Sequence, residues 1–284
     1  MPTFSRLLNQ AAHDIQEIAQ ESNLFEAQQL LLDAFDMSKA DFISSLHEPV
    51  TDDAAIKTFR TYIKKRKIGM PLSYILGHAA FLSHKYICKP GVLIPRPETE
   101  LLVSKLIQFI SSLNEEVAVF ELGYGSGVIP IELRYVFNHI DYYGWDINPL
   151  AYQLAKKNAK YHHFENLSLQ LGDFFDDAPQ LIQSINKPFI IVSNPPYVDS
   201  EDLEKLDFQV KEFEPLSALD GGEKGLRYYK HLLSVFNKQP LAYFFEIGIK
   251  QKAYLQPILD VYNFTKIQFY NDFHSIPRIL EIHR

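Results

Sequence analysis

The residues best suited to chemistry begin with the glycine-rich run Glu121-Leu-Gly-Tyr-Gly-Ser-Gly127. The run follows a predicted strand and opens a predicted helix, where glycines let the backbone turn tightly and approach a ligand. Free N–H groups at the start of a helix suit polar or anionic ligand atoms. A tight structural turn is the alternative interpretation, so the loop alone does not assign a ligand.

An acidic residue, Asp146, ends the next predicted strand, 23 residues after Gly123. A carboxylate at this point accepts hydrogen bonds from both hydroxyls of a ribose. The alternative is that Asp146 caps the helix predicted to start at Pro149. Together, the loop and Asp146 indicate a cofactor that contains a nucleoside, with NAD and S-adenosylmethionine both open.

A third motif, Asn194-Pro195-Pro196-Tyr197, follows the apolar strand predicted over 189–193. The two prolines fix two φ angles and remove two backbone donors, so the turn after the strand is rigid. The Asn194 side-chain carbonyl and the Pro195 backbone carbonyl offer two acceptors for the two hydrogens of one NH₂ group. Tyr197 can stack on a flat group. The motif therefore favours a site that binds a planar NH₂ group, whereas a rigid loop around a buried asparagine is the alternative without chemistry.

In this order, the three motifs resemble the amino-methyltransferases, which act on adenine or cytosine amino groups or on glutamine amides. Other stretches resemble the release factor glutamine methyltransferase (PrmC/HemK) family: Tyr74-Ile-Leu-Gly77 with Phe81, Val92-Leu-Ile-Pro-Arg-Pro-Glu-Thr-Glu100, Glu214-Pro-Leu-Ser-Ala-Leu219 with Gly221, Gly222, Gly225 and Leu226, and Glu246-Ile-Gly248 with Gln251. The similarity covers nearly the whole chain beyond residue 71. The most specific part is the Pro-Arg-Pro-Glu-Thr-Glu stretch that ends at Glu100, which disfavours the related ribosomal-protein glutamine methyltransferases.

The resemblance implies an α/β fold, with a Rossmann-like, seven-stranded class I methyltransferase domain preceded by a small helical bundle. It implies S-adenosylmethionine as cofactor, S-adenosylhomocysteine as product and no metal. The implied substrate is the glutamine of the Gly-Gly-Gln motif in class 1 peptide chain release factors. The expected cofactor-binding residues are Glu121, Gly123, Tyr124, Gly125, Ser126, Gly127, Asp146, Asp173, Phe174 and Asn194. The expected catalytic residues are Asn194, Pro195 and Tyr197, and Pro196 joins them in binding the substrate.

The chain departs from the family pattern at three positions. Glu121 stands where the family usually has Asp, Tyr124 where it has Thr, and Ser73 where it has Gln. Glu121 keeps an acid, so cofactor binding is still expected. Tyr124 brings a large side chain into the loop and is expected to narrow the cofactor pocket, whereas Phe174 is expected to pack beside the adenine.

Net charge and composition limit the classes of molecule that this protein is expected to bind. The formal net charge is −7, and the acidic surplus lies entirely beyond residue 90, in the part with the motifs. Proteins that grip nucleic acid through its backbone carry a basic surplus, so direct nucleic acid binding is not expected. The basic run Lys64 to Lys67 is expected to be a solvated helix end. One cysteine and the lack of a signal peptide or an apolar span indicate a cytoplasmic protein without a membrane partner, and we expect a monomer.

Periodicity predicts the elements that position these motifs. Helical spacing up to residue 76 predicts a bundle over 1–76, to which we assign substrate recognition, and 77–97 is predicted as a hairpin-like connector that turns at Lys89-Pro90-Gly91. The methyltransferase domain is predicted over 98–284, where strands and helices alternate around a mostly parallel sheet with a final antiparallel pair. The predicted strands are 117–122, 140–146, 167–171, 189–193, 241–247, 264–270 and 278–282. The predicted helices are 98–113, 128–137, 149–161, 225–236 and 251–262.

Two other classes of function compete with this interpretation. A DNA or RNA amino-methyltransferase shares the Asn-Pro-Pro-Tyr motif and predicts a basic groove or a base-recognition domain, which the sequence does not show. A non-catalytic cofactor-binding module predicts a damaged Asn-Pro-Pro-Tyr motif, and here the motif is intact.

Overall fold

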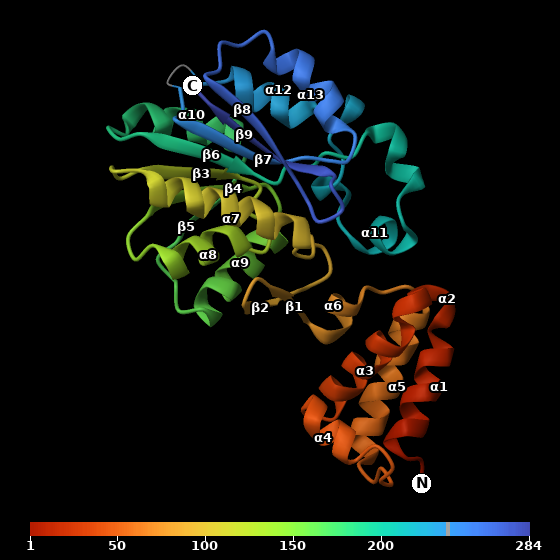
Figure 1. The fold of residues 1–284 in the computed structure, drawn as a ribbon. Helices are drawn as coiled ribbons and strands as arrows, with labels where there is room; N and C mark the ends of the chain where they lie inside the picture. Colours follow the sequence, from red (N-terminus) through yellow and green to blue (C-terminus); the bar gives the residue numbers. More distant parts are fainter. Residues whose placement is uncertain (237–238) are drawn as a thin grey trace. The chain divides into compact units, whose positions relative to one another are not determined.

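The computed structural model describes residues 1–236 and 239–284. The chain divides into two compact units, Met1–His78 and Ala79–Arg284, and each has a hydrophobic core of its own. Figure 1 shows the helical first unit in red and orange and the α/β second unit in yellow to blue.

The first unit is a bundle of helices whose apolar residues recur at three- and four-residue steps. Its elements are α1 (Phe4–Asp14), α2 (Gln16–Ala19), η1 (Gln20–Ser22), α3 (Asn23–Ala34), α4 (Lys39–Ser44), α5 (Asp53–Lys67) and α6 (Leu72–Leu76). Ser38 caps α4, and it forms a reciprocal capping box with Asp41. Asp52 caps α5, because its carboxylate accepts hydrogen bonds from two backbone N–H groups of the first turn.

Arg66 overturns the expectation that the whole basic run at the end of α5 is solvated. Its side chain is only 2% exposed and pairs with Glu26 on α3, with an Nε–Oε2 distance of 2.5 Å and an Nη2–Oε1 distance of 3.2 Å. A buried charge persists only when it is paired, so this contact is needed to place Arg66 in the core. The ion pair joins α3 to α5, whereas the three neighbouring lysines of the run are exposed.

The second unit contains a seven-stranded sheet with the strand order β5-β4-β3-β6-β7-β9-β8. Its strands are β3 (Ala118–Leu122), β4 (Asp141–Asp146), β5 (Ser168–Leu171), β6 (Phe189–Ser193), β7 (Ala242–Glu246), β8 (Lys266–Asn271) and β9 (Pro277–His283). The pairs from β5 to β7 are parallel, and β9 runs antiparallel to both β7 and β8, as the sequence predicts. Because β3 pairs with both β4 and β6, the order of connection reverses there, and ligands bind at such a switch point.

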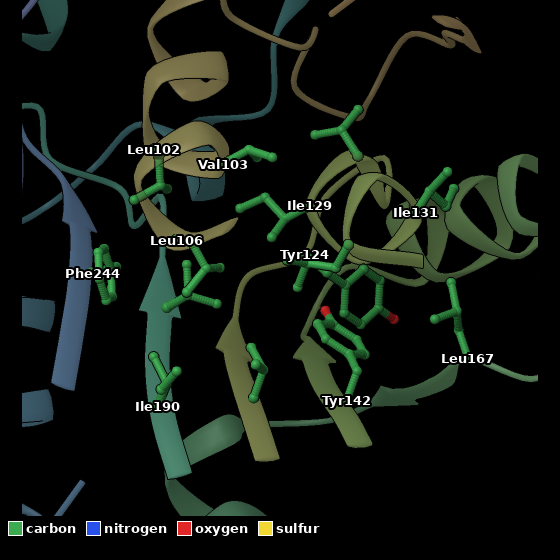
Figure 2. Packing of buried hydrophobic residues seen from close by; sticks show 14 of the residues in the cluster. Leu102, Val103, Leu106, Tyr124, Ile129, Ile131, Tyr142, Leu167, Ile190 and Phe244 are labelled. Atoms are coloured by element: carbon green, nitrogen blue, oxygen red, sulfur yellow. The ribbon is translucent and has the colours of Figure 1, made fainter. Parts of the chain in front are cut away.

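Helices cover both faces of this sheet (Figure 1). The helices α7 (Pro97–Ser112), α8 (Val128–Val136) and α9 (Pro149–Tyr161) contribute to one buried cluster. The opposite cluster contains side chains from α10 (Phe174–Ser184), α12 (Arg227–Ser234) and α13 (Gln251–Leu259). Figure 2 shows the first cluster, in which Leu106 of α7 packs near Ile190 of β6. Burial on both faces explains why β3 and β6 are apolar apart from Glu121 and Ser193.

The connector differs from the prediction. Its hairpin consists of β1 (His78–Phe81) and β2 (His84–Ile87), so it turns after Phe81 and not at Lys89-Pro90-Gly91, and residues 91–94 form no strand. The side-chain amide of Asn158 on α9 bonds to both the N–H and the carbonyl of Ile87. These bonds occupy the backbone at the end of β2, which a sequence pattern does not reveal.

Two further segments escaped the sequence analysis. Helix α10 contains Pro179, which interrupts the usual helical pattern. The segment between β6 and α12 holds four short elements: η2 (Ser200–Lys205), α11 (Phe208–Phe213), η3 (Leu216–Ala218) and η4 (Glu223–Gly225). Each of these elements has at most six residues, too short for periodicity to detect.

Candidate functional site

One pocket of the second unit lies at the carboxyl ends of β3, β4 and β6. Leu122 and Asp146 line it from the ends of β3 and β4, and Asn194 lines it from the turn after β6. Adjacent parallel strands end at the same edge of a sheet, which brings together motifs that are far apart in the chain. The pocket therefore collects parts of all three motifs.

The glycine loop joins β3 to α8 and forms one side of this pocket. Gly123 and Gly125 line it, with φ angles of +74° and +54° in the left-handed region that favours glycine. Gly127 lies away from the pocket at the start of α8. A Cβ there would lie 3.1 Å from the Cβ of Ala155, so glycine lets α8 approach α9 closely.

The carboxylate of Asp146 accepts hydrogen bonds from two backbone N–H groups. Its Oδ2 accepts from the N–H of Gly125 at 2.9 Å, and its Oδ1 accepts from the N–H of Asn148 at 2.8 Å. Burial raises the pKa of Asp146, and these two bonds oppose the rise. The cap of α9 is Asn148, which accepts from the N–H of Leu150, so the helix-cap alternative for Asp146 is wrong. Both carboxylate oxygens keep acceptor capacity for a ligand in the pocket.

Asn194 and Pro195 present two acceptors side by side in the chain. The Nδ2 of Asn194 donates to the Oγ1 of Thr99 at 3.0 Å. Within residues 1–236 and 239–284, no hydrogen bond reaches the Oδ1 of Asn194 or the backbone carbonyl of Pro195. Pro196 lines the pocket beside Asn194, whereas Pro195 itself is buried.

Tyr197 is anchored through its hydroxyl and its backbone and is not part of the pocket lining. The hydroxyl donates to the Oε1 of Glu246 at 3.2 Å, and the carbonyl of Tyr197 accepts from the Nε2 of Gln251 at 3.0 Å. Glu246 is fully buried at the end of β7, and burial raises its pKa to about 7. The motif is therefore fixed to the neighbouring strand through Tyr197.

Glu121 and Ser126, both expected to bind the cofactor, lie outside the pocket lining. The Glu121 carboxyl is 1% exposed and accepts a hydrogen bond from the Tyr142 hydroxyl. Burial raises the pKa of Glu121 to about 8. Ser126 is buried too, and its carbonyl accepts from the side chain of Asn158 at 2.9 Å. Both residues therefore stabilise the glycine loop through buried hydrogen bonds and do not line the pocket.

Tyr124 does not narrow the pocket, contrary to the expectation from the sequence. Its ring is buried in the cluster between the sheet and α8 and α9, and Figure 2 shows it beside Tyr142. The Tyr124 hydroxyl donates to the carbonyl of Gln170 at 3.0 Å. The loop turns this side chain toward the core, so the departure from threonine changes the packing and leaves the pocket open.

Three further residues line the side of the pocket next to β4 and α10. Asp173 caps α10 through a bond from the N–H of Phe175, and Phe174 is 2% exposed. The Phe174 ring stands edge-on to Trp145, with centroids 5.6 Å apart. Sequence reasoning missed Trp145, although its place immediately before Asp146 on β4 was an available signal.

The segment after α11 forms another wall of the pocket. Pro215, Ser217 and Ala218 line the pocket, and Glu214 precedes them with its side chain buried. The Nη2 of Arg96 lies 2.7 Å and 2.6 Å from the two carboxylate oxygens of Glu214. This ion pair ties the wall to the start of α7 and explains the Arg and Glu of two stretches that carry the family resemblance.

Within the described residues, no group of three or more His, Cys, Asp or Glu side chains is placed to hold a metal ion. In the same part of the chain, no helix combines the length and apolar character needed to cross a bilayer.

A glycine loop, an acid after the second strand and an Asn-Pro-Pro-Tyr turn on this sheet define a methyltransferase. Residues 113–216 match the family model described as a methyltransferase domain, and residues 6–77 match the PrmC N-terminal domain. The catalytic domain of hMettl16, solved with a MAT2A 3′UTR hairpin, has a similar fold, with a TM-score of 0.52 and 15% identity over 82% of each chain.

The chain belongs to the release factor glutamine methyltransferase family. The enzyme of that name from Bacillus subtilis is 31% identical over 99% of this chain and 97% of its own length. Its counterpart from Clostridium botulinum is 34% identical over 77% of each chain, and the one from Thermodesulfovibrio yellowstonii is 30% identical over 91% of each.

Proposed function

We propose that this protein transfers a methyl group from S-adenosylmethionine to the glutamine side-chain amide in the Gly-Gly-Gln motif of class 1 peptide chain release factors. Through this modification it would act on translation termination. The observation that carries the proposal is that Asn194 lines the pocket that also contains Asp146, and that its Oδ1 and the adjoining backbone carbonyl of Pro195 accept no hydrogen bond within the described residues. The family of the chain supports the choice of substrate.

The pocket residues fit the proposed cofactor. Asp146 would accept from the ribose hydroxyls, since its half-buried carboxylate lines the pocket and keeps acceptor capacity. Phe174 and Trp145 offer apolar surface for the adenine. Gly123 and Gly125 leave backbone exposed where side chains would otherwise intrude. When bound, the cofactor supplies a methyl group that is already strongly electrophilic, so we propose no metal for this step.

The protein's part in the reaction is to position a weak nucleophile. The lone pair of an amide nitrogen is delocalised into its carbonyl, so orientation and electrostatics carry most of the catalysis. The acceptors of Asn194 and Pro195 would bind the two amide hydrogens, direct the nitrogen toward the methyl group and stabilise the positive charge that develops on nitrogen. The Tyr197 ring would hold the amide plane. We assign no general base, and the proton leaves to solvent after transfer.

We assign recognition of the release factor to the bundle over 1–76, treat 77–97 as the connector and place catalysis in 98–284. The helical unit and the match to the PrmC N-terminal domain support this division. The protein would work as a cytoplasmic monomer without direct binding to nucleic acid or membranes, in keeping with its acidic surplus.

The test is incubation of the protein with isotopically labelled S-adenosylmethionine and purified release factor, followed by peptide mass spectrometry. We expect one labelled methyl group on the glutamine of Gly-Gly-Gln. A parallel reaction replaces that glutamine by asparagine and should remain unlabelled. Label found in added DNA or RNA, with none in the release factor, would show that the nucleic acid alternative is correct.

A further inference from the structure

Two buried polar residues behind the pocket, Thr99 and Glu246, have no part in the function proposed above. Thr99 is the third residue of α7 and is 3% exposed, and Glu246 ends β7 with no exposed surface. Both come from stretches that carry the family resemblance. Burial of a hydroxyl and a carboxyl is unfavourable unless hydrogen bonds compensate for the lost water.

A chain of hydrogen bonds connects these residues to the pocket. The Nδ2 of Asn194 donates to the Oγ1 of Thr99 at 3.0 Å, and the Thr99 hydroxyl donates to the Oε2 of Glu246 at 2.6 Å. The other oxygen of Glu246 accepts from the Tyr197 hydroxyl at 3.2 Å. The chain therefore joins the start of α7 to the ends of β6 and β7.

The charge on Glu246 decides which group donates and which accepts in each of these hydrogen bonds. An ionised carboxylate only accepts hydrogen bonds, and a hydroxyl has a single proton. While Thr99 donates to Glu246, it can only accept from Asn194, so the NH₂ of Asn194 must face Thr99. Its Oδ1 then faces away from Thr99, and Asn194 lines the pocket.

The flipped amide is disfavoured by the same rule. With Oδ1 facing Thr99, the hydroxyl would have to donate to Asn194 and Glu246 would lose that donor. A hydrogen bond to a buried charge is stronger than one between neutral groups, so this loss is costly.

We propose that Thr99 and Glu246 are positioning residues that keep the Asn194 amide turned with its carbonyl oxygen toward the substrate nitrogen. The proposal rests on the proposed function only for the identity of that nitrogen. The hydrogen-bond chain exists in the protein without substrate.

The proposal predicts a dependence on pH. Burial raises the pKa of Glu246 to about 7, Glu98 adds to the rise, and Thr99, Tyr197 and Arg278 oppose it. The Tyr229 hydroxyl bonds to the backbone carbonyl of Glu246. Above this pKa the Glu246 carboxylate accepts a hydrogen bond from the Thr99 hydroxyl, which in turn accepts from the NH₂ of Asn194. As the pH falls through the pKa, Glu246 becomes protonated and can donate to the Thr99 hydroxyl. Thr99 can then donate to the Oδ1 of Asn194, so the Asn194 amide is free to flip.

The first test observes the amide directly, in the cofactor-free protein. The side-chain NH₂ resonance of Asn194, assigned by comparison with Asn194→Ser, should titrate with a midpoint near that of Glu246. Thr99→Val has nearly the same shape without the hydroxyl and should abolish this titration, whereas Thr99→Ser should retain it. An Asn194 resonance that does not respond to pH in the parent protein, or responds equally in Thr99→Val, overturns the proposal.

The second test measures single-turnover methyl transfer at saturating cofactor. Thr99→Val should slow transfer about ten- to a hundredfold, by analogy with the loss of a residue that orients a metal ligand. Its rate should no longer fall between about pH 8 and about pH 6, on either side of the pKa of Glu246. Thr99→Ser should stay within about threefold of the parent. Glu246→Gln can present an NH₂ to Thr99 and should be slow at every pH.

Two further measurements distinguish a positioning role from a purely structural role. Cofactor affinity, measured by calorimetry, should be unchanged in Thr99→Val. Equal losses of transfer rate in Thr99→Val and Thr99→Ser, together with a lower melting temperature, would indicate a purely structural role and overturn the proposal. If the parent shows the amide titration but does not methylate release factors, the proposed function fails and the positioning chain stands.

Discussion

Asp146 and Asn194 are both short polar side chains at the end of a parallel strand, and each is held by partners outside the pocket. Backbone N–H groups hold Asp146, and Thr99 holds Asn194. The sequence predicts their place because Asp146 ends one predicted strand and Asn194 follows another. It does not predict the Thr99 contact, because that residue lies 95 positions away and meets Asn194 only in the folded sheet.

The direction of a side chain within a loop is equally hard to predict. Glu121 lies near the end of β3 and Tyr124 in the loop that follows, and both side chains are buried. Their hydrogen-bond partners are Tyr142 and the carbonyl of Gln170, which come from other strands. Spacing along the chain carries no information about those partners.

Asn194→Ala should fold normally and lose about 10²–10³ in the rate of methyl transfer, because one of two preorganised acceptors disappears. Asn194→Asp should also be clearly slower, because it keeps an acceptor but cannot donate to Thr99. Tyr197→Phe should be milder, because the ring remains and Glu246 keeps its bond from Thr99. Single-turnover assays at saturating cofactor measure all three. A fully active Asn194→Ala beside an inactive Tyr197→Phe would assign the chemistry to the tyrosine hydroxyl.

Asp146→Ala should weaken S-adenosylmethionine binding by roughly 1.5–3 kcal/mol, the usual value of hydrogen bonds to a charged group. Titration calorimetry measures the change. Asp173→Ala is a useful comparison, because Asp173 lines the same pocket and its carboxylate caps α10. Unchanged affinity in Asp146→Ala would remove this residue from the cofactor site.

At the scale of elements, the long periodic segments follow the sequence closely. The strands β3 to β7 and the helices α7, α8 and α9 begin and end within about two residues of their predicted bounds. The failures are α10, which contains a proline, the hairpin β1–β2, whose last residue bonds to Asn158, and the short elements between β6 and α12. In the first two cases a local feature or a distant side chain accompanies the departure from the periodic pattern, and in the third the elements are too short for periodicity to detect.

Gly225, at the end of η4, illustrates how elements meet at the site. Its φ is +65°, and a Cβ there would lie 1.9 Å from the carbonyl oxygen of Tyr197 and 2.5 Å from the Nε2 of Gln251. Gly225→Ala should therefore displace the Asn-Pro-Pro-Tyr turn, lower the unfolding free energy by roughly 1–3 kcal/mol and slow methyl transfer.

The control is Gly77→Ala, because Gly77 has a similar φ of +76° with no atom within 4 Å of the added Cβ. It should show only the conformational cost of about 1–2 kcal/mol and no change in cofactor affinity. Denaturant unfolding and transfer assays on both variants make the comparison. Parental activity in Gly225→Ala would mean that the turn tolerates the displacement.

At the scale of the whole molecule, charge separates the chain into two parts. The first 90 residues carry equal numbers of basic and acidic side chains, and the net charge of −7 arises beyond them. The sequence predicted a helical part and an α/β part, because their apolar spacings differ. The proposed recognition of a release factor would depend on the surface of the bundle, which apolar spacing does not describe.

Deletion of residues 1–70 should leave cofactor affinity within a few-fold, because every residue that lines the described pocket lies in the second unit. Methylation of an intact release factor should be abolished, because the proposed recognition surface is gone. Calorimetry and the mass-spectrometric assay measure the two effects. A melting curve checks that the truncated chain is folded, and a folded truncation that modifies the intact factor at the parental rate would exclude a recognition role.

Trp145 gives this protein an optical property. It is the only tryptophan in the chain, it lines the pocket, and its indole lies between the rings of Phe120 and Phe174. Fluorescence excited selectively in the indole therefore reports on one location. A nucleoside that enters the pocket should change the intensity or the wavelength of the emission without any attached dye. Titration with S-adenosylhomocysteine should give a saturable signal in the parent protein and a weaker apparent affinity in Asp146→Ala, which makes rapid-mixing measurements of cofactor association accessible in the unmodified chain.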